Sequence, residues 1–151
     1  MVLNQKINDM KKLLVCAFLV VALGSLSFTT RFGLDGYEIF LNNKSVLKQY
    51  INQPLNLRVL NLDQAKETDQ LRIVYKHCRL DNGTGTGRGI ALKDQAGTIL
   101  HQWSFTDAGQ MTILVKDLRQ AEKKSGKNKL SLYYTAHELE KGEMLAMISL
   151  K

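Results

Sequence analysis

The amino-acid sequence predicts an all-β fold, mainly antiparallel, built as a two-layer β-sandwich of about eight strands. Three observations lead to this prediction. Short runs of alternating apolar and polar residues recur about every 8 to 16 positions, which is typical of an antiparallel sandwich. Gly, Asn and Asp residues that favour turns separate these runs. Only one stretch, near residues 117–124, has the period of a helix, and it is short.

An apolar leader helix is expected before these runs. Residues 1–12 carry three lysines and one aspartate, Leu13–Leu23 is apolar throughout, and Gly24–Ser27 supplies small residues. This order of a basic, an apolar and a small-residue segment is typical of a secretory signal peptide. The sequence therefore predicts a signal peptide at residues 1–27 and a single domain at residues 28–151.

Two fates of the leader remain open. Cleavage after Gly24 or Ser27 would release the domain into the periplasm or the extracellular space. Retention would leave the leader as a membrane anchor, although Leu13–Phe28 is shorter than the about 20 apolar residues of a spanning helix. Both outcomes predict an exported protein.

The first half of the domain contains four alternating runs. They are Gly36–Leu41, Val46–Ile51, Leu55–Val59 and Leu71–Cys78. The first two are separated by Asn42 and Asn43, which tolerate a positive φ, so a hairpin with a tight turn is expected there. The fourth run is followed by a Gly-rich loop at residues 81–89, which has too many glycines for regular structure.

The stretch Thr98–Val115 has the strongest alternation in the chain. Its two apolar runs are joined by a polar turn, so we expect a β-hairpin at the centre of the domain. The only tryptophan, Trp103, is then expected between the two layers. The first run also has a natural partner in Gly89–Lys93, across a turn at residues 94–97.

The period changes after Val115. Asp117 is expected to cap a helix of about two turns with Gln120, and Gly126 to follow its last turn. Two further strands, Leu130–Tyr134 and Met144–Leu150, complete the domain and are separated by an expected loop at residues 136–142.

The charge and the cysteine content restrict the partners. The formal net charge is +7, and the three lysines and one aspartate of the leader contribute +2 of it. A surplus of this size favours anionic surfaces without selecting among them. The densest basic cluster, residues 119–129, has no interleaved aromatic residue, and an exported protein seldom meets nucleic acid, so no nucleic-acid partner is expected. Only Cys16 and Cys78 are present, so an exported domain without its leader has no intramolecular disulfide.

The Gly-rich loop is the one candidate for a binding site. Its glycines match neither the dinucleotide-binding nor the phosphate-loop pattern, so a mobile connection between strands is the expected structure. The alternative is that its backbone amides and two neighbouring arginines receive an anionic group. The residues of this candidate ligand-binding loop are Arg79, Gly83, Gly85, Gly87 and Arg88.

No catalytic, cofactor-binding or metal-binding residue is predicted. His77 and Cys78 are neighbours on an expected strand, where they would point to opposite faces and could not form a dyad. The other histidines, His101 and His137, are too far apart in sequence to show zinc-ligand spacing. The carboxylates form no recognisable acid and base pair, and Glu138, Glu140 and Glu143 belong to the expected loop.

Three functions are compatible with these observations. The favoured one is a non-catalytic binding or structural module of the cell envelope or extracellular space, with an unknown protein, a glycan or an anionic surface such as lipid headgroups as its partner. The alternative is a small exported hydrolase whose carboxylates the fold assembles. It would require two acidic side chains within about 10 Å, one of them with a raised pKa. A carrier of apolar ligands would require a closed barrel with a lined cavity.

Overall fold

The structure is a computed structural model that describes residues 33–52, 54, 58–107 and 110–150. The expected leader at residues 1–27 lies outside these residues. Within the described part the chain forms nine strands and one helix. No helix in that part has the length and apolar character needed to cross a bilayer.

Four strands form the first sheet, in the order β2-β1-β4-β7. They are β1 (Gly36–Leu41), β2 (Lys44–Tyr50), β4 (Gln70–Lys76) and β7 (Met111–Leu114). All their pairings are antiparallel. The expected hairpin is confirmed, because β1 pairs with β2 across Asn42 and Asn43, whose φ angles are 47° and 68°.

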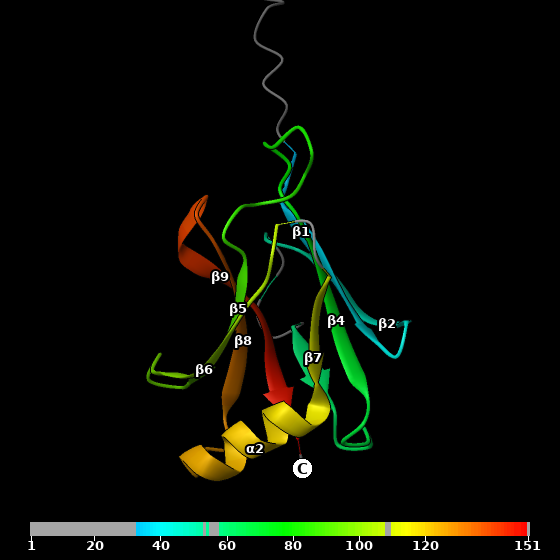
Figure 1. Ribbon diagram of the computed structural model, residues 1–151, viewed down its shortest axis with the longest axis vertical. Helices are drawn as coiled ribbons and strands as arrows, with labels where there is room; N and C mark the ends of the chain where they lie inside the picture. The colour runs from blue at the N-terminus through cyan, green and yellow to red at the C-terminus, as the bar shows by residue number, and fades with distance from the viewer. Residues whose placement is uncertain (1–32, 53, 55–57, 108–109, 151) are drawn as a thin grey trace, which may run out of the picture. The chain divides into compact units, whose positions relative to one another are not determined.

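Five strands form the second sheet, in the order β3-β9-β8-β5-β6. They are β3 (Val59–Asn61), β5 (Gly89–Asp94), β6 (Ile99–Ser104), β8 (Leu130–Ala136) and β9 (Leu139–Ser149). Only the β3 and β9 pair is parallel. Figure 1 shows these strands facing those of the first sheet, so the predicted two-layer, mainly antiparallel sandwich is confirmed.

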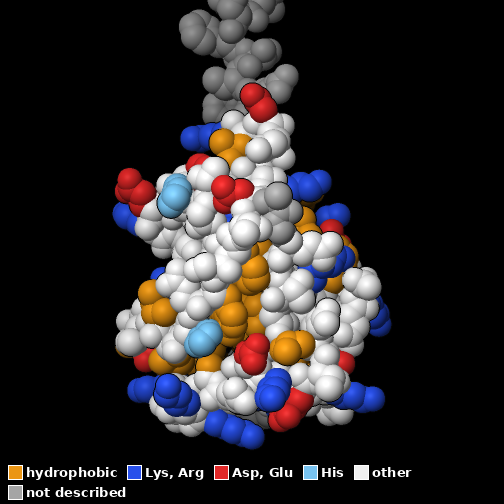
Figure 2. All heavy atoms as spheres, viewed as in Figure 1, with side chains coloured by type: hydrophobic (Ala, Val, Ile, Leu, Met, Phe, Trp, Pro, Cys, Tyr) orange, Lys and Arg blue, Asp and Glu red, His pale blue; other side chains and the backbone are white. Residues whose placement is uncertain are grey.

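The alternation of each strand places one face of each sheet in a common core. From the first sheet Ile39, Ile73 and Ile113 are buried, and from the second sheet Ile90 and Leu132 are buried. These side chains belong to one apolar cluster. In Figure 2 an apolar strip remains visible between the sheets, over the region where Figure 1 draws β5, β6 and β7.

The single helix, α2 (Val115–Ser125), follows β7 without a break. It lies at the end of the sandwich opposite the Gly-rich loop (Figure 1). Gly126 ends it in the left-handed conformation, as expected. Its predicted start was wrong: Leu114 is the N-cap and makes no side-chain cap bond, while Asp117 lies within the first turn.

The expected hairpin at Thr98–Val115 was also wrong. Its first run is β6, which pairs with β5, whereas its second run is β7, which pairs with β4 in the other sheet. The chain between them therefore crosses from one layer to the other. Since β6 is at a sheet edge, Trp103 is half-buried rather than enclosed, and its ring lies 4.4 Å from the ring of His101.

Several other boundaries also differ from the expectation, most clearly those of the loop at residues 136–142 and of the third strand. The loop predicted at residues 136–142 is a two-residue turn, His137 and Glu138, because β9 begins at Leu139. The third strand begins at Val59, whereas it was expected at Leu55–Val59, of which residues 55–57 are outside the described part.

Arg58, just before β3, is the most deeply buried charged side chain in the described part, with an exposed fraction of 1%. Its guanidinium donates to the carboxylate of Glu143 and to the carbonyl of Met144, both at 2.8 Å, and to the carbonyl of Ile51. A buried charge is tolerated only when it is paired and hydrogen-bonded, and these acceptors meet that requirement. Arg58 therefore links the start of β3 to the middle of β9.

Candidate functional site

The Gly-rich loop is held by side chains from other parts of the fold. The Glu138 carboxylate accepts hydrogen bonds from the backbone N–H and the hydroxyl of Thr86, both at 2.9 Å. The N–H of His137 donates to the Thr86 carbonyl at 2.9 Å. On the other side, Asp107 accepts the N–H of Gly87 at 2.8 Å. The loop, expected as a mobile connection, is therefore held to the turn before β9 and to the segment after β6 by hydrogen bonds.

Two glycines of this loop are required for different reasons. Gly83 has a φ of +65°, a left-handed conformation that favours glycine. Gly85 has no such requirement, but a Cβ at this position would lie 2.7 Å from His77 Nε2, 2.8 Å from the Tyr134 hydroxyl and 2.9 Å from Glu138 Oε2. Three polar side chains therefore converge on a point where only a glycine fits.

Beneath Gly85 lies a chain of hydrogen-bonding groups. Asp35 Oδ2 is 3.2 Å from His77 Nδ1, and His77 Nε2 is 3.1 Å from the Tyr134 hydroxyl. The Tyr75 hydroxyl donates to the same Asp35 oxygen at 3.2 Å, and the Cys78 N–H donates to the other oxygen at 2.8 Å. His77 is buried, with an exposed fraction of 6%. We call Asp35, His77, Tyr75 and Tyr134 the polar cluster.

The polar cluster continues into a stack of aromatic rings that crosses the core. The rings of Tyr75 on β4 and Tyr134 on β8 are 4.1 Å apart and nearly parallel, so they join the two sheets. Tyr37 on β1 extends the stack, with its ring centre 6.4 Å from that of Tyr75. Because Tyr37 also donates to the carbonyl of Leu145, each hydroxyl of the stack has a partner inside the fold.

The surroundings determine which groups are charged. Burial tends to raise the pKa of Asp35, but the hydrogen bonds from Cys78 and the nearby His77 outweigh it, so this pKa is lowered. Burial raises the pKa of Tyr134 to about 12, against a lowering effect of Arg88. Burial and the Asp35 carboxylate also raise the pKa of Tyr75. At neutral pH Asp35 is therefore ionised and both phenols are protonated.

The order of carboxylate, imidazole and hydroxyl resembles that of a hydrolase triad. However, Tyr134 is fully buried beneath Gly85, and its raised pKa opposes formation of a nucleophilic phenolate. Asp35 precedes β1, His77 follows β4 and Tyr134 lies on β8. The arrangement therefore suits fixing the two sheets together better than attacking a substrate.

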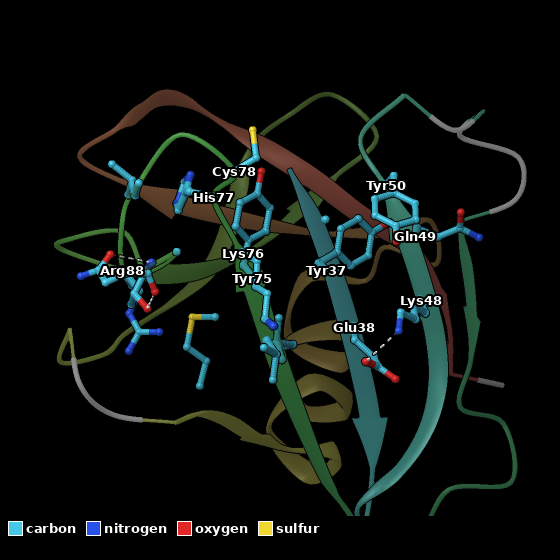
Figure 3. Close-up of a pocket in the computed structure, with 18 of the residues that line it drawn as sticks. Tyr37, Glu38, Lys48, Gln49, Tyr50, Tyr75, Lys76, His77, Cys78 and Arg88 are labelled. Carbon is cyan, nitrogen blue, oxygen red and sulfur yellow. Dashed lines mark hydrogen bonds and ion pairs between the residues drawn. The ribbon is translucent and has the colours of Figure 1, made fainter. Parts of the chain in front are cut away.

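A hollow of about 820 Å³ lies beside the polar cluster. Its lining includes basic residues, acidic residues and aromatic rings from β1, β2, β4 and the loops that follow. The basic residues are Lys48, Arg72, Lys76 and Arg88, the acidic ones are Glu38, Asp81 and Asp107, and the aromatic ones are Tyr37, Tyr50, Tyr75 and His77. Figure 3 shows Lys48, Gln49 and Tyr50 on β2 to one side of β1 and β4, with His77 and Arg88 on the other side.

Most of these charges already have partners in the described part of the chain. Lys48 Nζ lies 3.8 Å from Glu38 Oε2, and the Arg72 guanidinium carbon lies 4.0 Å from the centre of the Phe40 ring. Lys76, in contrast, is exposed and forms no ion pair with any described residue. The ring of Tyr50 is also accessible, since half of this residue is exposed. Lys76 and Tyr50 are therefore the lining groups most available to a ligand.

The candidate residues from the sequence are only partly brought together. Gly83 and Arg88 line the hollow, whereas Arg79 is exposed and is not among the lining residues. Arg88 has an exposed fraction of 8% and donates to the Thr106 carbonyl at 2.6 Å, so it is committed to the fold. Gly85 and Gly87 do not line the hollow, and a Cβ at these positions would meet the side chains of His77 and His137 respectively.

His77 and Cys78 point in different directions. His77 enters the polar cluster, while the Cys78 thiol donates to the carbonyl of Gly33 at 2.6 Å. A hydrogen bond with Asp35 raises the pKa of the thiol, which disfavours the reactive thiolate. Among the described residues, no three His, Cys, Asp or Glu side chains gather as a metal site.

The sequence did not indicate Asp35, Glu138 or the polar role of the two tyrosines. Tyr75 shares a strand face with Leu71 and Ile73 and is buried with them in the core. A buried tyrosine hydroxyl needs a partner, and that requirement was the one available signal. It does not identify the partner, because Asp35 is 40 positions away and His77 is 57 positions from Tyr134.

Comparison with protein-family models, with curated proteins and with solved structures found no match for this chain.

Proposed function

We propose that this chain is an exported, non-catalytic binding module whose ligand occupies the hollow beside the polar cluster. The observation that carries this proposal is the hollow itself, about 820 Å³ in volume and lined by charged, amide and aromatic side chains. Ligand sites commonly have volumes of about 300 to 1,000 Å³ and a few convergent polar groups. Export rests on the leader-like sequence of residues 1–27.

The chemistry of the lining favours a polar ligand with an anionic group, such as an acidic glycan. The ring of Tyr50 offers an accessible face on which an apolar sugar face can stack, and the Lys76 ammonium can pair with a carboxylate, sulfate or phosphate. Gln49 and Asn82 add amide groups that both donate and accept hydrogen bonds. An apolar ligand would leave these polar groups without partners.

The alternative of a hydrolase has less support. Asp35 and Glu138 are the acidic side chains around His77 and Gly85. A general acid should have a raised pKa, but both carboxyl groups have a lowered pKa: in Asp35 hydrogen bonds and His77 outweigh burial, and in Glu138 the Thr86 N–H is the main cause. The polar cluster is therefore better suited to ordering the wall of the hollow.

Binding of the full-length chain to an array of neutral and acidic glycans tests the proposal. We expect Tyr50→Ala and Lys76→Glu each to weaken binding at least about tenfold, which corresponds to about 1.4 kcal/mol. Lys123→Glu is the matched control, because it makes the same charge change at an exposed position of α2 at the other end of the domain. Equal losses for both lysine variants would indicate a general charge effect and refute binding at the hollow, as would the absence of binding to every glycan.

A further inference from the structure

The two sheets of the sandwich have four edge strands, and three of them are protected against pairing with another chain. β3 has three residues and β7 has four, and very short edge strands are poor templates. β2 has seven residues, but it carries Lys44 and Lys48 and has a register irregularity opposite Ile39 and Phe40. Charged residues and bulges are common means of blocking an edge.

β6 lacks these protections over most of its length. Its six residues, Ile99–Ser104, include no Asp, Glu, Lys, Arg or Pro. An irregularity near Leu92 and Lys93 affects only its first residues, and His101–Trp103 pair regularly with Ile90–Leu92. An exposed edge strand without charged residues or proline is a template for the addition of a further strand.

The hydrogen bonds between β5 and β6 show which backbone groups of β6 are open to a further strand. The N–H of Phe105 donates to the Arg88 carbonyl at 2.9 Å, so Phe105 faces β5. In an antiparallel pair alternate residues bond to opposite sides, so Trp103 and His101 also face β5, while Gln102 and Ser104 face outward. No described strand pairs with that outer side, and both residues are exposed.

Partly exposed apolar side chains lie on β6 and next to it, beside its unpaired backbone groups. Ile99 has an exposed fraction of 53%, and Leu100, Trp103 and Phe105 are only partly buried against the core. The apolar strip in Figure 2 lies over the same region of the sandwich. A strand added at β6 would therefore gain both backbone hydrogen bonds and apolar contact.

We infer that β6 is the edge through which two copies of this chain pair, antiparallel, about a two-fold axis beside Gln102. Gln102 is the outward-facing residue nearest the middle of the regular segment, so its N–H and carbonyl would pair with those of the other Gln102. The axis then places the His101 of one copy opposite the Trp103 of the other, on the inner face. This inference is independent of the proposed ligand in the hollow.

The absence of charge on β6 makes it an edge at which a second copy can pair. The chain has a formal net charge of +7, of which the leader contributes +2, and like net charge on the whole opposes the association of two copies. A symmetric pairing sets residues equidistant from the axis opposite each other, and like charges so placed are destabilising. The six residues of β6 contain no residue with a permanent charge, so two copies can meet there without this cost. A two-fold interface also closes on itself and does not extend into a fibre.

Cysteine cross-linking in the full-length chain tests the pairing. In a background with Cys16→Ser and Cys78→Ser, Gln102→Cys places two thiols across the axis, within reach of a disulfide. Ser45→Cys on β2 is the matched control, because it is also an exposed position on an edge strand. We expect mild oxidation to give at least about ten times more linked dimer for Gln102→Cys than for Ser45→Cys. Equal amounts of linked dimer, or none for Gln102→Cys, would overturn the inference.

A loss-of-pairing variant gives a second, independent readout. The double variant Gln102→Lys/Ser104→Lys brings like charges together beside the axis but leaves the bonds to β5 intact, so we expect the dissociation constant of the dimer to rise at least about tenfold. Circular dichroism confirms that the variant is folded, light scattering measures the mass, and Ser45→Lys is the control. A wild-type protein that is monomeric at about 100 μM, or a dimer that the two lysines do not weaken, would refute the interface.

Discussion

The two ends of the sandwich are ordered by different forces. At the end with α2, Val115 and Leu118 are fully buried, and Arg119 donates to the carbonyls of Leu62, Ala65 and Leu150. At the end with the Gly-rich loop, the contacts are those of the polar cluster and of Glu138 with Thr86. An arginine remains charged throughout the accessible pH range, but carboxylates and imidazoles do not. The α2 end should therefore respond to side-chain volume, and the loop end to protonation and to space at one glycine.

The largest effect is expected from Leu118→Ala at the α2 end. Leu118 is fully buried, so the substitution removes apolar contact and leaves a cavity, at a cost of about 2 to 5 kcal/mol in the free energy of unfolding. Urea unfolding measures the loss, with the exposed Lys124→Ala as a control. The loss should be the same at about pH 7 and about pH 4.5, because the cost of the cavity does not depend on protonation. A loss below about 1 kcal/mol would show that α2 is not part of the core.

Gly85→Ala is expected to cost about 1 to 3 kcal/mol at the loop end, because its methyl group would overlap His77, Tyr134 and Glu138. The cause is space and not backbone conformation, so removing one of the overlapping atoms should help. In the double variant with Tyr134→Phe, the total loss of stability in urea should therefore be smaller than the sum of the two single losses. Additive losses would contradict this explanation.

The pH dependence of stability also distinguishes the two ends, by an effect of similar size. Because the pKa of Asp35 is lowered in the folded state, its ionised form stabilises the fold above about pH 4, and this contribution is lost as the pH falls through the lowered pKa. Asp35→Asn should reduce stability by about 1 to 3 kcal/mol at about pH 7, since donors from His77, Tyr75 and Cys78 lose the carboxylate.

The same variant should approach the stability of the wild type as the pH is lowered from about 7 toward about 2 and the Asp35 carboxylate of the wild type takes up a proton. Urea unfolding across this pH range measures the convergence. Asp81→Asn serves as the control, because Asp81 is exposed and forms no hydrogen bond with a described residue. If the free energy of unfolding of Asp35→Asn stays below that of the wild type by the same amount down to about pH 2, the charge of Asp35 does not stabilise the fold.

Alternation and turn residues were sufficient to predict the strands but not all of their partners. The β1 and β2 hairpin was predictable, because Asn42 and Asn43 define its turn locally. The run Thr98–Val115 also alternates on both sides of a polar segment, yet β6 and β7 belong to different sheets. Alternation reports that a run has one buried face, and it carries no information about which strand lies beside it.

The candidate site was less predictable than the fold. The four glycines of the loop were visible in the sequence, but the space requirement at Gly85 arises from side chains at positions 77, 134 and 138. Asp35, His77 and Tyr134 show no local motif, because each belongs to a different part of the chain. Only the packing of the two sheets brings them within hydrogen-bonding distance.

The position of Arg58 also affects the order in which the chain folds. The hairpins β1–β2, β5–β6 and β8–β9 join neighbours in sequence and can form early, whereas Arg58 and its acceptor Glu143 are 85 positions apart. Until β9 is in place, the guanidinium lacks two of its acceptors and remains in water. We therefore expect docking of β3 along β9 to be a late step, so that a chain still being synthesised completes its core only once β9 has been made.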